Sequence, residues 1–188
     1  MAGEPLHPTL WRTCRVLANV IRLGLLAQLV RRQPQSVSEL AEKCALTLPV
    51  ASPSLRALEA RGLLKVKRIR RRVEYHISTP AEAGPQARLI AALTKALRCE
   101  PSPAQQIIQL ATAFTHPSRI QIYRTLHISP KTPAQIQAEI GLSALALRRH
   151  RQKLLKRGYI GLDAVEGTYK CLKQSSPIGR ALSALALS

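Results

Sequence analysis

Apolar residues recur at helical spacing through most of the chain. Spacings of three or four residues place them on one face of a helix, which predicts an amphipathic helix packed on a core. Two long stretches show this spacing: residues 10–31 with Leu17, Ile21, Leu25 and Leu29, and residues 107–127 with Leu110, Phe114, Ile122 and Leu126. Each of them also contains a break, where small residues precede an arginine (Arg22 and Arg119).

The chain contains two copies of one pattern. Residues 36–64 align with residues 132–160 without gaps, at an offset of 96 positions. Few residues are identical, but the apolar, capping and glycine positions recur, as expected for a structural repeat. The matched pairs are Leu40 with Ile136, Leu46 with Leu142, Thr47 with Ser143, Leu58 with Leu154, and Gly62 with Gly158.

Each copy predicts a short helix, a tight turn and a longer helix. The short helices are expected over residues 37–44 and 134–140. The hydroxyl of Thr47 or Ser143 is expected to cap the longer helix, and Gly62 or Gly158 to end it. A helix, a short turn and a second helix form the unit that places its second helix in a DNA groove.

A hairpin is predicted after each glycine. Residues 63–78 place apolar positions on both sides of an arginine-rich tip, and residues 159–172 place Gly167 at a tip. The predicted fold class is therefore mainly α with small β-hairpins.

Two further apolar helices are predicted, near residues 86–99 and 176–187. The first lies between breaker-rich segments and carries Leu89, Ile90, Leu93 and Leu97 on one face. Three roles are open for this helix: packing on its own domain, docking the two copies together, or pairing two chains. We expect domains over residues 1–79 and 105–188, joined by a linker with a short helix over residues 80–104.

Charge indicates a polyanionic partner. The net charge is +19 and the isoelectric point is about 11.1. Residues 1–79 and 111–188 each carry a surplus of +9, while residues 80–110 carry +1. Two basic domains facing nucleic acid or an acidic membrane would explain this distribution. No apolar run reaches the ~18 residues of a membrane span, so we expect a cytoplasmic, nucleoid-associated protein without membrane contact.

Residues 10–30 and 36–64, followed by a basic hairpin, resemble winged-helix regulators of the arsenical-resistance-repressor (ArsR) type. Residues 113–171 resemble the same family more distantly. The resemblance implies tandem winged helix-turn-helix domains, double-stranded operator DNA as partner, and dimerisation through terminal helices. The two helices near 86–99 and 176–187 would then form an intramolecular pseudo-dimer or a homodimer. Many relatives sense metals through cysteines on the first helix of this motif, where Cys44 here stands without a neighbouring cysteine or acid.

The sequence shows no pattern that is typical of a catalytic or metal site. Cysteines and histidines lack the spacing of metal ligands, and no nucleophile stands with a base and an orienting group. We expect a protein that is not an enzyme, with no metal and no cofactor.

In the second copy, the longer helix is expected to read DNA. Leu147 and Leu154 would face inward and leave a basic outer face, on which arginine suits guanine edges and lysine suits phosphates. Arg151 falls in a partly buried slot, where it would run along the core edge or orient the helix. The candidate contacts are Arg148, Arg149, Gln152, Lys153 and Lys156.

In the first copy, the hairpin is expected to supply most of the contacts. The longer helix has Ser52 and Pro53 at the positions that match Arg148 and Arg149, and its candidate contacts are only Ser52 and Ser54. Pro53 suggests that this helix begins late, with Ser52 as N-cap. An arginine-rich tip suits a narrow minor groove or the phosphate backbone. Its candidate residues are Lys67, Arg68, Arg70, Arg71 and Arg72.

These patterns leave three functions open. The first is a sequence-selective transcriptional regulator that binds duplex DNA. The second is a sequence-neutral architectural DNA-binding or RNA-binding protein, although the sequence shows no aromatic cluster for stacking single-stranded bases. The third is an adaptor that binds an acidic protein.

Overall fold

The computed structural model describes residues 9–70, 72–98 and 103–188. It is mainly helical with two small antiparallel sheets, as the sequence predicts. The first repeat contains α1 (Leu10–Leu17), α2 (Val20–Arg31), β1 (Gln35–Ser36), α3 (Val37–Lys43), α4 (Leu48–Glu59), β2 (Leu64–Ile69), β3 (Arg72–Ile77), α5 (Pro80–Ala83), the 3-10 helix η1 (Gly84–Gln86) and α6 (Ala87–Leu97). The second repeat contains α7 (Ala104–Ala111), the 3-10 helix η2 (Thr112–Phe114), α8 (Pro117–Ile128), α9 (Pro133–Ile140), α10 (Ala144–Lys156), β4 (Ile160–Asp163), β5 (Thr168–Cys171) and α11 (Pro177–Leu187).

The two repeats share their order of main elements. Two helices, a short helix, a longer helix, a hairpin and a final helix follow one another in both. The short strand β1, which the sequence pattern did not predict, pairs with β3 through Gln35 and Tyr75. At the corresponding place in the second repeat, Lys131 forms an isolated bridge with Tyr169. The repetition predicted from residues 36–64 and 132–160 therefore extends over the whole of both units.

Reciprocal capping begins the short helix of each repeat. The Ser36 backbone N–H donates to Glu39 Oε2 at 2.7 Å, and the Glu39 N–H donates to Ser36 Oγ at 3.3 Å. Thr132 and Gln135 form the same capping box at 2.8 and 3.4 Å. Each box satisfies two N–H groups that the first turn of a helix leaves without intrahelical partners.

The longer helices begin where the sequence places their caps, but the two caps differ. Ser143 Oγ accepts the Ala146 N–H at 3.3 Å, whereas Thr47 occupies the N-cap of α4 without a side-chain cap bond. The interpretation that α4 begins at Ser52 is wrong, because the helix begins at Leu48 and continues through Pro53. An interior proline removes one ladder hydrogen bond. Burial of the apolar face of α4 offsets that loss; the face consists of Ala51, Leu55 and Leu58.

The arginine that follows each helix break holds the backbone of that break. Arg22 Nη1 donates to the carbonyls of Arg15 and Val16 at 3.3 and 3.5 Å. In the second repeat, Arg119 is 8% exposed, and its Nε donates to the carbonyl of Ala113 at 2.5 Å. The last carbonyls of a helix lack intrahelical donors, so both arginines have a structural role at equivalent positions.

The two hairpins differ in length and tip. β2 and β3 pair in register from Leu64 opposite Ile77 to Ile69 opposite Arg72. β4 and β5 pair only from Ile160 opposite Cys171 to Asp163 opposite Thr168. Gly167 lies in the turn of this shorter hairpin with a φ of 62°, a conformation that glycine adopts without a steric penalty.

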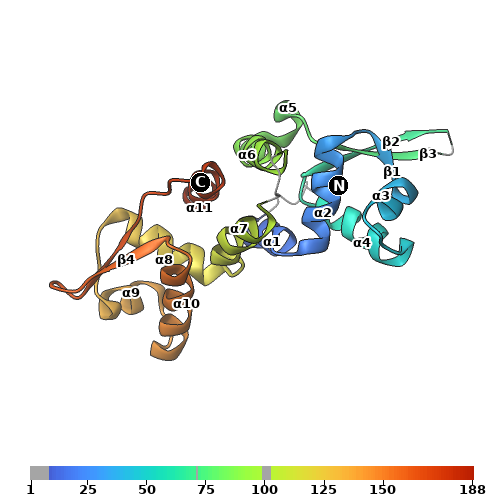
Figure 1. Cartoon of the computed structure of the whole chain (residues 1–188). Helices are drawn as coiled ribbons and strands as arrows, with labels where there is room; N and C mark the ends of the chain where they lie inside the picture. The colour runs from blue at the N-terminus through green and yellow to red at the C-terminus, as the bar shows by residue number, and fades with distance from the viewer. Residues whose placement is uncertain (1–8, 71, 99–102) are drawn as a thin grey trace, which may run out of the picture.

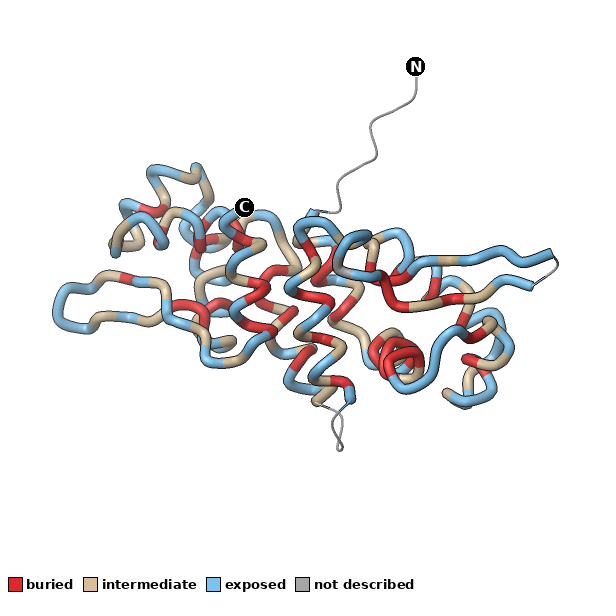
Figure 2. The backbone as a smooth tube through the Cα atoms, turned by 90° about the horizontal axis from the view of Figure 1, so that it is seen from above, coloured by how far each residue is buried: buried red, intermediate tan, exposed pale blue. Residues whose placement is uncertain are grey.

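The buried residues of both repeats form one cluster. α1 contacts α7 and η2, and α6 contacts α11, so the repeats pack together in the centre of an elongated molecule (Figures 1 and 2). The hairpins extend from its opposite ends, while α4 and α10 lie on the side away from α5, α6 and α11 (Figure 1). The boundary predicted after residue 79 lies immediately before α5, and the one after residue 104 lies at the first residue of α7.

Within the described residues, no single helix is long and apolar enough to cross a membrane. α1 and α2 reach that length only together, and they are bent by 86° relative to each other.

Candidate nucleic-acid interface

α10 exposes one basic face. Its inner side is held by Leu147, 2% exposed, and Leu154, which is fully buried. The five residues of α10 predicted to contact DNA are all exposed: Arg148, Arg149, Gln152, Lys153 and Lys156. Helix α10 contains no acidic residue. In the part of the chain that the structure describes, none of the ion pairs involves its four exposed cations. These charges are therefore directed to solvent and available to an anionic partner.

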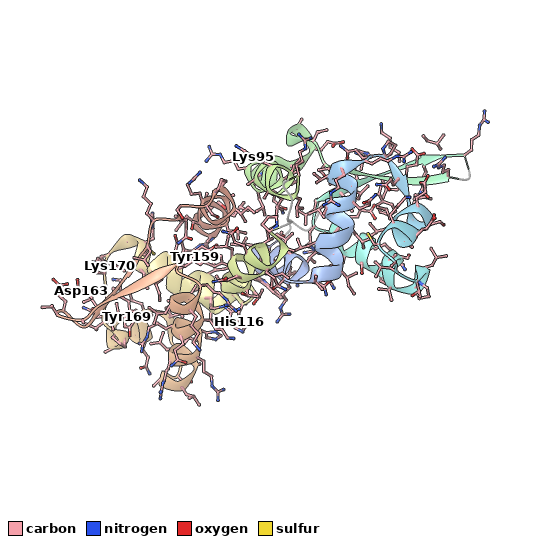
Figure 3. All side chains as sticks on the ribbon, in the orientation of Figure 1. Lys95, His116, Tyr159, Asp163, Tyr169 and Lys170 are labelled. Atoms are coloured by element: carbon pink, nitrogen blue, oxygen red, sulfur yellow. The ribbon has the colours of Figure 1, made fainter. Side chains whose placement is uncertain are left out.

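Arg151 fixes α10 to the second hairpin. Its guanidinium carbon lies 4.3 Å from the centre of the ring of Tyr169, the residue labelled in Figure 3. Tyr169 is 8% exposed. A guanidinium within about 6 Å of a ring centre is attracted by the electron-rich face of the ring. Arg151 thus orients the helix, as one of the two sequence interpretations expected, but the identity of its partner was not predictable from spacing.

A double-mutant cycle tests the contact between Arg151 and Tyr169. Arg151→Met and Tyr169→Leu keep apolar volume but remove the cation and the ring, and their coupling in the free energy of unfolding should be about 0.5–2 kcal/mol. Urea unfolding of the four proteins measures it. The matched pair Arg56→Met with Tyr169→Leu, in which Arg56 belongs to α4, should be additive. Equal coupling in both cycles would contradict the contact.

His150 on α10 packs against His116, the N-cap of α8. The ring centres are 4.5 Å apart, and His116 Nδ1 accepts the Ser118 N–H at 3.2 Å. Burial is the main cause that lowers the pKa of both imidazoles. The charge of Arg119 lowers both pKa values further, and Arg15 on α1 lowers that of His116. Neutral rings are therefore favoured at this contact between the helix and its scaffold.

Acidification should weaken the folded state through this pair. Because both folded-state pKa values lie below the ordinary 6.5, the unfolded chain binds protons more readily, and stability decreases as the pH falls below 6.5. His150→Gln should make the urea midpoint less dependent on pH between pH 7 and pH 5. His127→Gln, at an exposed position of α8, is the matched control and should leave the dependence unchanged. A wild-type midpoint that does not fall with pH would contradict this expectation.

α4 presents a mostly uncharged surface at the position equivalent to α10. Leu48 and Val50 are 51% and 39% exposed. Of the two predicted contact residues, Ser54 donates its hydroxyl to the Val50 carbonyl at 2.8 Å, and Ser52 Oγ accepts from Arg56 Nη2 at 3.4 Å. Both hydroxyls are thus used within the helix, which leaves apolar side chains as the main feature of its exposed N-terminal part.

The first hairpin exposes cations beyond the body of the molecule. Lys67, Arg68 and Arg70 are exposed, and Arg71 lies outside the described residues. Arg72 differs from the others, since its guanidinium lies 3.0 Å from Glu39 Oε1 and 3.1 Å from Glu74 Oε1. Arg72 therefore joins β3 to α3 through carboxylates that sequence spacing did not reveal, while its side chain remains 57% exposed. Its contact with DNA stays a prediction.

The second hairpin carries acidic groups near its tip. Asp163 lies 3.4 Å from Lys170 across the two strands (Figure 3). Val165 is 96% exposed. Backbone N–H groups of the turn, Glu166 first, and then Lys170 lower the pKa of Asp163. The two hairpins therefore differ in charge as well as length, and only the first offers a cationic surface.

The described residues contain no group of three or more histidine, cysteine or acidic side chains able to hold a metal ion. The basic surface of α10 and the first hairpin is the main candidate site on this chain. Comparisons of the chain with models of protein families, with curated proteins and with solved structures found no match.

Proposed function

We propose that this chain is a transcriptional regulator that binds double-stranded DNA sequence-selectively through tandem winged helix-turn-helix domains of the ArsR type. One observation carries the proposal: α10, the second helix of a helix-turn-helix pattern, directs Arg148, Arg149, Lys153 and Lys156 to solvent without an acidic partner in the described residues. A helix of this kind fits the major groove, where arginine pairs with guanine edges. Such a regulator acts in the cytoplasm, on the DNA of the nucleoid.

The arrangement of the repeats supports one chain acting as a pseudo-dimer. α4 and α10 lie on the same side of the molecule, and the hairpins extend at its two ends (Figure 1). α6 contacts α11 within the chain. Related dimers place two recognition helices about one DNA turn, ~34 Å, apart. A single chain with this arrangement would cover two half-sites.

The two half-sites would differ in sequence. α10 offers arginine and glutamine for base edges, whereas α4 offers Leu48 and Val50, which suit apolar contact with thymine methyl groups. The first hairpin, through Lys67, Arg68 and Arg70, would add contacts to the phosphate backbone or the minor groove. The preferred site would therefore be asymmetric.

Selection of bound sequences from a random duplex pool tests this function. An enriched, asymmetric motif and binding that weakens with salt are expected. Binding without an enriched motif would favour an architectural role, and preference for RNA in competition with duplex DNA would favour RNA binding. Absence of binding to either nucleic acid at low salt would overturn the proposal.

A further inference from the structure

A cavity of about 930 Å³ lies where the two repeats meet. Its wall is formed by the first turn of α1, the turn between α4 and β2, the segment around η1, and parts of α8 and α11. Pockets that hold small molecules commonly measure 300–1,000 Å³ and occur between domains. The cavity is separate from the outer face of α10 described above.

The wall combines an apolar surface with an excess of positive charge. Leu10, Trp11, Ile120 and Leu185 supply apolar and aromatic groups. Three cations, Arg61, Lys65 and Arg124, also line the cavity. Within the described lining, Glu82 is the only acidic side chain, and its carboxylate accepts hydrogen bonds from the Thr79 N–H and hydroxyl at 2.8 and 2.9 Å. These bonds lower the pKa of Glu82. The lining therefore combines three cations with one carboxylate that is already hydrogen-bonded.

Two buried polar groups in this wall lack hydrogen-bond partners in the described structure. Thr13 is fully buried and Gln86 is 6% exposed, and Thr13 Oγ1 and Gln86 Oε1 are both unpaired. A buried polar atom without a partner costs about 1–3 kcal/mol. Thr13 and Gln86 both line the cavity, so polar groups of a bound ligand would offer partners to these two atoms.

We propose that this cavity binds a small organic anion with a flat apolar body, such as an aromatic carboxylate or sulfonate. The ring would pack on the surface formed by Trp11, Ile120 and Leu185, and the anionic group would lie toward Lys65 and Arg61. Arg124 also donates Nε to the Ala186 carbonyl at 2.5 Å, so it braces the wall while contributing its charge.

The cavity adjoins the DNA-contacting elements of the first repeat. Arg61 and Lys65 lie on either side of Gly62, the residue with a φ of 67° that joins α4 to β2. A ligand held by these two cations would act on the helix and the hairpin at their junction. An effect of the ligand on DNA binding rests on the proposed function, whereas binding of the ligand to the cavity does not.

Anilinonaphthalene sulfonate, which combines aromatic rings with one anionic group and fluoresces when bound, is a suitable probe. The full chain should bind it saturably with one probe per chain. Lys65→Glu, which reverses a wall charge, and Ala83→Trp, which fills the space, should each raise its Kd by about tenfold or more. Lys67→Glu, the same charge change on the same strand outside the cavity lining, should leave Kd unchanged. Far-ultraviolet circular dichroism checks that each variant is folded.

The outcomes separate ligand binding from DNA binding. Absence of saturable binding, or equal Kd values for the wild type, Lys65→Glu and Ala83→Trp, would overturn the site. These measurements use no DNA, so they remain valid if the proposed function fails. If the selected duplex is bound, saturating probe should change its Kd at least about threefold in the wild type and not in Ala83→Trp; an unchanged Kd in the wild type would overturn the coupling.

Discussion

Replacing Arg148 and Arg149 together by alanine is expected to weaken binding to a selected duplex far more than binding to random duplex. Both side chains are exposed on α10, and each good bidentate contact with a base is worth about 1–3 kcal/mol. The loss on the selected sequence should therefore be about 5- to 150-fold for each arginine that makes such a contact. Fluorescence anisotropy at one fixed salt concentration, with both duplexes, measures the difference.

A charge-matched variant in the first hairpin provides the comparison. Arg68→Gln with Arg70→Gln also removes two positive charges, but from residues proposed to contact the backbone. It should weaken selected and random duplex by similar factors and reduce the salt dependence. Arg88→Ala, at an exposed position of α6 on the other side of the molecule, should change neither. Equal losses on both duplexes for the α10 and hairpin variants would contradict the proposed division.

Replacing Phe114 by alanine is expected to lower the free energy of unfolding by about 3–5 kcal/mol. Phe114 is fully buried in η2, and its ring centre lies 5.2 Å from that of Tyr123 and 4.6 Å from that of Tyr159, both in edge-to-face geometry. Because η2 also contacts α1 of the first repeat, the cavity would open beside the junction of the two units. Urea unfolding followed by circular dichroism measures the loss.

Two further variants test the cause of this loss. Phe114→Leu keeps most of the apolar volume and should lose clearly less stability than Phe114→Ala. Val165→Ala, at a position that is 96% exposed, should change the free energy of unfolding by less than about 0.5 kcal/mol. A loss below 1 kcal/mol for Phe114→Ala would contradict the central position of this ring.

The sequence predicted those helices whose position depends on residues close together in the chain. Periodic leucines located α2, α6, α10 and α11, and the glycines after α4 and α10 ended those helices, with φ values of 67° and 72°. The prediction failed at Pro53, because the burial of one face of α4 outweighs the single hydrogen bond that proline removes. It also missed β1, whose two residues gain their strand geometry only from pairing with β3.

The exposed face of α10 was predictable for the same reason. Helical periodicity alone separates Leu147 and Leu154 from the arginines on the opposite side. The partners of the other candidates were not predictable. Arg72 is far in sequence from Glu39, and His150 is far from His116, so only the folded chain brings each pair together.

The order of residues by itself determined two basic helical units. Each has capped helices, a longer helix that ends at a glycine, and a hairpin, because these features depend on contacts within a few residues. Tertiary packing alone decided that the units share one core through α1, α6, α7 and α11, that α4 and α10 lie on one side, and that a cationic, partly apolar cavity forms at their junction. The physical reason is that burial of apolar faces depends on which surfaces meet, and segments about 100 residues apart carry no local signal of that meeting.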